Sequence, residues 1–119
     1  MKHPVELQIS ESERLAILTA LPLIREISIP NPVNAELFYI CAETAEKVLN
    51  SNELFFSPGE VRTISAAVSC AVLICEGKPN EFISSVSDTN AWKETLSRHY
   101  FVLKKLDPVL GRFCEVHLC

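Results

Sequence analysis

Glycine is scarce in this chain, with only three among 119 residues. Phosphate-binding loops and dinucleotide-binding turns need closely spaced glycines so that backbone amides can approach the phosphates. The glycines at 59, 77 and 111 are too scattered to build such a loop. The sequence also lacks an H-E-x-x-H zinc motif, an EF-hand loop and a recognisable nucleophile signature. It therefore indicates neither catalytic residues nor a cofactor. A protein that is not an enzyme is the simpler interpretation, and an active site assembled from residues distant in the sequence stays an alternative.

Long apolar runs are also missing. The start of the chain lacks the apolar stretch of a secretory signal. The longest uncharged run, Thr63–Cys75, has 13 residues, and a membrane-spanning helix needs about 20. The five cysteines are odd in number and irregularly spaced, which is typical of reduced thiols in a cytosolic protein. We expect a soluble cytoplasmic protein that does not cross a membrane.

Positive charge is limited and unevenly distributed. The formal net charge is −4, with four basic and nine acidic residues in 1–60 against seven and six in 61–119. A dedicated DNA-binding protein usually carries a basic surface that neutralises phosphates, so the overall charge argues against nucleic acid. One local basic group remains near the C-terminal end, and it leaves open an alternative function as a nucleic-acid-associated regulator. Its members are Arg98, Lys104, Lys105 and Arg112.

Apolar residues are abundant, at 48% of the chain, and their spacing is mostly helical. Ser57-Pro58-Gly59-Glu60 combines an N-cap, a proline at the first helical position and a capping-box glutamate. Gly77 then predicts the helix end. The residues between are so predominantly apolar that we expect a helix buried on nearly all sides. We predict one all-α domain over 1–119, an irregular bundle of four or five helices around this central helix at about 58–76.

Three further helices have named start and stop signals. The S-x-x-E capping box Ser10–Glu13 opens the first, which Pro22 should kink or end. Asn31-Pro32 opens the second, with an apolar set that we expect to face the core. Asp88 or Thr89 caps a long fourth helix to about Leu106, ended by Asp107-Pro108. The apolar set of the second helix is Val33, Leu37, Ile40, Cys41, Ala45 and Val48.

Short segments outside these helices are harder to assign. Asn80 to Val86 could form a short helix. Residues 5–9 alternate like a weak strand, and the tail Gly111 to Cys119 reads as a loop or short strand. A minor two-stranded pairing of the N- and C-terminal tails is therefore one expectation.

The C-terminal tail holds three side chains that are typical zinc ligands, Cys114, His117 and Cys119. Cys-x2-His is a usable local spacing, although a structural zinc site normally takes four ligands. A second tight Cys/His pair does not occur in the sequence, so packing or exposed thiols are the simpler interpretation. A metal- or ligand-responsive domain remains an alternative function.

Two aromatic residues fall on polar sides of their predicted helices. Tyr39 lies among Glu36 and Glu43, whereas Phe101 lies among Arg98, Lys104 and Lys105. Aromatic residues bordered by charge are typical anchors of protein interfaces. We therefore predict a protein-protein interaction or accessory module. Because the two borders have opposite charge, we expect one molecule's second helix to meet another's fourth helix, most simply in a homodimer.

Overall fold

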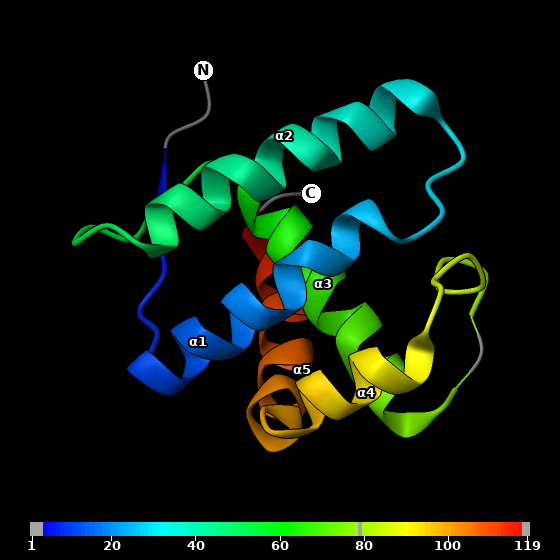
Figure 1. Cartoon of the computed structure of the whole chain (residues 1–119). Coiled ribbons are helices and arrows are strands. Elements are labelled where there is room, and N and C mark those ends of the chain that lie inside the picture. Colours follow the sequence, from blue (N-terminus) through cyan, green and yellow to red (C-terminus); the bar gives the residue numbers. More distant parts are fainter. Residues whose placement is uncertain (1–3, 79, 118–119) are drawn as a thin grey trace.

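The protein is an irregular helical bundle built on one central helix. The computed structural model describes residues 4–78 and 80–117, with only the backbone of His117. Figure 1 shows the helices packed around α3. The elements in order are β1 (Val5–Glu6), α1 (Glu11–Ala20), the 3-10 helix η1 (Leu21–Arg25), α2 (Pro32–Leu49), β2 (Phe55–Phe56), α3 (Pro58–Glu76), α4 (Thr89–Ser97) and α5 (Tyr100–His117).

The central helix α3 confirms the predicted all-α fold and the predicted helix at 58–76. Ser57 and Glu60 form the capping box, and Gly77 ends the helix in the left-handed region at φ 65°. α1, η1, α2, α4 and α5 all pack against α3. Its small residues Ala67 and Ala71 are fully buried, which lets neighbouring backbones come close.

The helix starts predicted for α1 and α2 are also confirmed. Ser10 and Glu13 form a capping box at α1, and the Asn31 side chain accepts from the amides of Val33 and Asn34 at α2. Pro22 falls in the first turn of η1, where the α-helix tightens to 3-10 geometry. A proline removes one helical hydrogen bond, so the change of geometry begins at the residue the sequence indicates.

The predicted single helix from about 88 to 106 is wrong in two respects. It breaks at Arg98 and His99 into α4 and α5, and α5 then continues through Pro108. Leu103, Leu106 and Leu110 are buried on both sides of the proline. Pro108 itself is exposed, so water can solvate the carbonyl that loses its partner. Packing of α5 on α3 thus offsets the missing hydrogen bond.

The expected pairing of the two tails is also wrong. Val5 and Glu6 of β1 pair antiparallel with Phe56 and Phe55 of β2. The tail from Gly111 to His117 forms the last turns of α5 instead, because the packing that carries the helix past Pro108 extends it. The short helix expected over Asn80 to Val86 is a series of turns.

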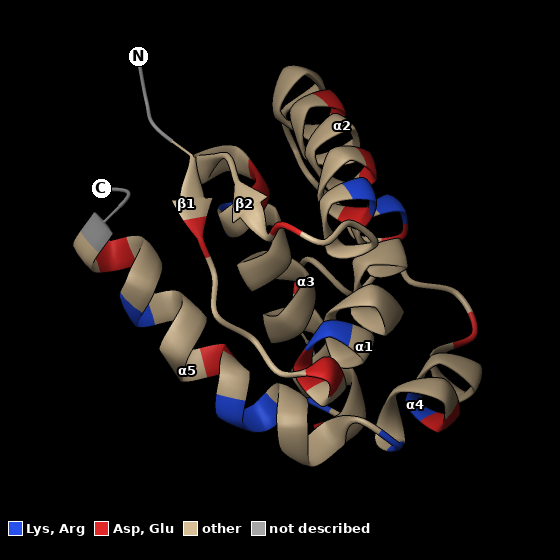
Figure 2. Cartoon of the chain, turned by 90° about the vertical axis from the view of Figure 1, so that its left-hand side faces the viewer, with Lys and Arg blue, Asp and Glu red and all other residues tan. Residues whose placement is uncertain are grey.

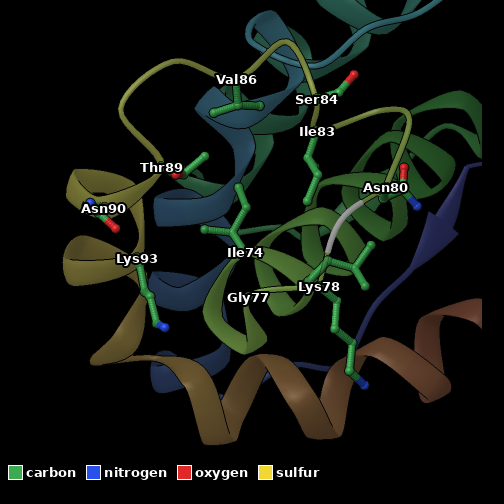
Figure 3. A pocket seen from close by; sticks show the side chains of 11 residues that line it. Ile74, Gly77, Lys78, Asn80, Ile83, Ser84, Val86, Thr89, Asn90 and Lys93 are labelled. Atoms are coloured by element: carbon green, nitrogen blue, oxygen red, sulfur yellow. The ribbon is translucent and has the colours of Figure 1, made fainter.

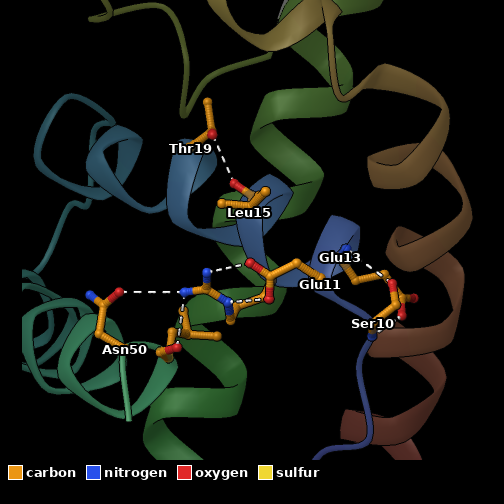
Figure 4. A network of polar contacts seen from close by, with 8 residues as sticks. Ser10, Glu11, Glu13, Leu15, Thr19 and Asn50 are labelled. Carbon is orange, nitrogen blue, oxygen red and sulfur yellow. Dashed lines mark hydrogen bonds and ion pairs between the residues drawn. The ribbon is translucent and has the colours of Figure 1, made fainter. Parts of the chain in front are cut away.

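A polar network ties the start of α1 to the end of α2 (Figure 4). Arg14 donates to both carboxylate oxygens of Glu11, at 2.6 and 2.9 Å. The same guanidinium donates to the Leu49 carbonyl at 3.2 Å, where the last turn of α2 leaves carbonyls without helical partners. Arg14 thus fixes one end of α2 against α1.

α3 is the one helix of the described chain that is long and apolar enough to cross a membrane by length and composition. It has 19 residues, and 56% of its most apolar stretch is buried within the protein. Core helices meet the same criteria, and the neighbours packed along α3 identify it as a core helix here.

Replacing the cap of α3 should measurably weaken the fold. The Ser57 hydroxyl accepts from the Glu60 amide at 3.2 Å, and Glu60 Oε1 accepts from the Ser57 amide at 2.6 Å. We expect Ser57→Ala to lower the free energy of unfolding by about 1 kcal/mol, measured by urea titration. The control Ser12→Ala, at an exposed position within α1, should stay within about 0.5 kcal/mol of wild type. Equal effects of the two changes would contradict the capping role.

Candidate interaction surfaces

The outer face of α2 exposes a row of large apolar side chains. Val33, Leu37 and Ile40 are 69%, 54% and 50% exposed, and their four- and three-residue steps put them on one face. The sequence predicts one apolar stripe that joins these three residues to Cys41, Ala45 and Val48. The structure divides this stripe, because Ala45 is buried whereas the three lie outside the core. The core side of α2 instead carries Ala42, Ala45 and Leu49. This helix is apolar on two faces, and its small alanines allow close contact with the bundle.

An apolar groove runs beside this row, between α2 and the start of α3. It is a cavity of about 240 Å³. Gly59 has no side chain to fill it, and a Cβ there would lie 3.1 Å from Cys41 Sγ. Burial raises the pKa of the Cys41 thiol, and its hydrogen bond to Thr63 opposes this, so Cys41 is a packing residue at neutral pH. The lining residues are Asn34, Leu37, Phe38, Cys41, Gly59, Arg62 and Thr63.

Tyr39 is less accessible than the sequence suggested. It is half-buried and packs against the core, and the Arg25 guanidinium lies 5.7 Å from its ring centre. Arg25 also forms an ion pair with Glu43. Glu36 and Glu43 are exposed on the edge of α2. Tyr39 thus belongs to a contact between η1 and α2, and the apolar row beside it is the more accessible surface.

The outer face of α5 is also apolar, but it carries positive charge. Phe101 is 78% exposed, and Val109 and Val116 are 63% and 67% exposed. Lys105 and Arg112 are exposed and lie between these residues at helical steps of three and four, so all five share a face. The prediction of Phe101 on an accessible side of its helix agrees with this exposure.

The other predicted basic residues lie elsewhere. Lys104 Nζ is 3.5 Å from Glu76 Oε2 and 3.2 Å from the Tyr100 hydroxyl, and Tyr100 donates to Glu76 at 2.6 Å. These contacts raise the pKa of Lys104 and lower the pKa of Glu76, with the Tyr100 hydrogen bond as the largest cause of each shift. Lys104 therefore joins α5 to the end of α3. Arg98 is exposed at the break between α4 and α5.

The predicted metal ligands are only partly described. Cys114 is half-buried, whereas Cys119 and the side chain of His117 lie outside the described residues. The metal site therefore stays a prediction. Within residues 4–78 and 80–116, no group of three His, Cys, Asp or Glu side chains could hold a metal ion. Cys41, Cys70 and Cys75 form no disulfide within this part of the chain.

A larger cavity of about 570 Å³ lies between the end of α3, the turns after it and the start of α4 (Figure 3). Its floor includes the buried Ile74, Ile83 and Val86. Its cationic lining residues, Lys78 and Lys93, are exposed, and Lys78 pairs with Glu76 at 3.2 Å. The cavity thus combines an apolar floor with solvated charge, without a buried polar side chain directed into it among the described lining residues.

The sequence missed the exposed apolar row of α2, although a signal existed. The apolar residues of this helix lie on two of its sides, one through Val33 and Leu37 and the other through Ala42 and Ala45. An excess of apolar residues over one core face could have indicated a second contact surface.

No protein-family model, curated protein or solved structure matches this chain.

Proposed function

We propose that this protein is a non-enzymatic interaction module that self-associates through the outer faces of α2 and α5. The observation that carries the proposal is the distribution of exposed apolar side chains. Among the described residues, the large hydrophobic side chains exposed by half or more all lie on these two faces. Contiguous exposed apolar patches usually mark interaction sites, whereas isolated ones need no explanation.

The charges and thiols of the chain are consistent with this function in a reducing, cytoplasmic setting. Apolar centres with charged borders are the usual anatomy of a protein interface. On α2 the border includes Glu36 and Glu43, whereas on α5 Lys105 and Arg112 lie between the apolar residues. Cys41, Cys70 and Cys75 form no disulfide with one another, which suits a compartment that keeps thiols reduced.

Self-association can be tested by the mass in solution. We expect light scattering to give a mass above the 13.3 kDa of one chain, rising with protein concentration. Leu37→Glu or Phe101→Glu should return the mass to that of one chain at the same concentration, because each places a charge in the centre of an apolar face. Leu15→Glu is the control, since Leu15 is 43% exposed on α1, outside both faces. A wild-type mass of one chain at every concentration would contradict the proposal.

A further inference from the structure

The two proposed surfaces are complementary in shape. The α2 side offers a hollow, the apolar groove of about 240 Å³. The α5 side offers a projection, since Phe101 has the largest exposed fraction among the described large hydrophobic residues. An aromatic side chain that fills an apolar pocket is a typical energetic centre of an interface. One copy thus carries the projection, and another copy carries a hollow of suitable chemistry.

The chemistry of the groove suits an aromatic ring better than a charged group. Leu37, Phe38 and Cys41 line it from α2, and Gly59 lies on the α3 side. The cysteine there is not a reactive thiol at neutral pH, because burial raises its pKa. The hydroxyl of Thr63 already has a partner, because it donates to the Gly59 carbonyl at 2.8 Å.

Charge disfavours contact between two α5 faces, whereas the α2 surface carries charges of both signs. Lys105 follows Phe101 by one helical turn, and Arg112 lies further along the same face. On the α2 side, Glu36 is adjacent to Leu37 on the edge of the apolar row, and Glu43, already paired with Arg25, follows two turns later. Lys47 also borders this surface, and Arg62 lines the groove itself, so attraction to an α5 face is confined to the edge that carries Glu36. Two α5 faces would bring Lys105 and Arg112 against their own copies, which is repulsive.

The positions of the helices determine how such contacts propagate. Figure 2 shows α3 between α2 and α5, and both helices direct their buried residues toward the bundle. Their outer faces therefore point away from each other. A two-fold dimer that used the α2–α5 contact twice would need both faces on one side of the molecule. When two copies meet through one α2–α5 contact, one copy still has a free α5 face and the other still has a free α2 face. Further copies can therefore bind at both ends of the pair.

We infer that copies of this chain associate head to tail, with Phe101 of one copy in the α2/α3 groove of the next. This inference rests on the proposed self-association and specifies its partner surface. It requires that wild-type mass rise beyond two chains as concentration increases, because the assembly does not close. It also requires that each copy use its two faces independently.

Complementation of two variants tests the inference. Leu37→Glu removes the α2 face and retains the α5 face, whereas Phe101→Glu does the reverse. We expect each variant alone to remain a single chain by sedimentation velocity. An equimolar mixture should form a two-chain species of about twice 13.3 kDa and grow no further, because each variant supplies one intact face.

Each other outcome has a distinct meaning. Persistent association of Phe101→Glu alone would show that α2 faces pair with each other, and persistent association of Leu37→Glu alone would show that α5 faces do; either overturns the inference. A wild-type mass that stops at two chains would indicate a closed dimer and would also overturn it. A mixture that stays at one chain, with an associating wild type, removes the inference and leaves the proposed function. A wild type that never associates removes both.

The variants should fold, because both changed side chains are largely exposed. Circular dichroism and thermal unfolding of each variant provide that control. A second pair, Ile40→Glu and Val109→Glu, alters the same two faces at different positions. It should reproduce the complementation pattern, and a failure of the second pair where both variants are folded would count against the inference.

Discussion

Replacing Ile64 with alanine should lower the free energy of unfolding by about 2–5 kcal/mol, which is the usual range for removing a large buried aliphatic side chain. Ile64 lies on α3 and is fully buried. The loss combines the transfer free energy of the removed methyl and methylene groups with the cost of the cavity they leave. It is a large share of the roughly 5–15 kcal/mol by which domains are stable, and urea unfolding followed by circular dichroism measures it.

The same substitution on α2 provides a matched control. Ile40 is 50% exposed, so Ile40→Ala should change the free energy of unfolding by no more than about 0.5 kcal/mol. The measurement should be made at low protein concentration, because association would add stability that depends on concentration. Comparable losses of stability for the two variants would mean that the side of α2 that carries Val33, Leu37 and Ile40 is buried.

The second large effect concerns the reactivity of Cys70. Burial, with a contribution from the nearby Asp107 carboxylate, raises the pKa of this thiol from its ordinary 9.0 to about 11. The thiolate is the reactive form, so at pH 8 its fraction should be about 100-fold lower than in the unfolded chain. Alkylation by iodoacetamide, followed by peptide mass spectrometry, should therefore label Cys70 about 100-fold more slowly in the folded protein than in urea.

Restricted access would also slow this reaction, and the pH profile separates the two causes. A raised pKa means that the folded state holds the thiol proton more tightly. The contribution of this group to stability is thus fully present below about pH 9 and is lost as pH rises toward 11. The labelling rate of the folded protein should still be rising at pH 10. A rate that levels off near pH 9 would show that access alone protects Cys70.

The helix starts were predictable because their causes are local. A capping box joins residues only three positions apart, as in Ser57 and Glu60, and a proline acts on the turn that contains it, as Pro22 does. The central place of α3 was predictable for a related reason. A helix with so few polar positions can be stable only when neighbours cover it on most sides.

The errors arose where tertiary packing outweighed local rules. Pro108 ends a helix by its own chemistry, yet burial of Leu106 and Leu110 against the bundle carries α5 past it. The break at Arg98 and His99 occurs where the sequence has neither glycine nor proline. At Pro108 the packing of residues distant in the sequence outweighed the local preference for a helix end.

By itself, the sequence determined the fold class, the starts of the first three helices and the identity of the central helix, because these depend on interactions within one or two turns. Only the tertiary structure decided which of the two apolar sides of α2 is buried, and where the partner strand of β1 lies. The first choice depends on how alanines at 42 and 45 fit against neighbouring helices, and the second depends on the contact between residues about 50 positions apart, Val5 and Phe56. Burial of the alanines leaves Val33, Leu37 and Ile40 exposed, and these residues form the candidate surface on α2.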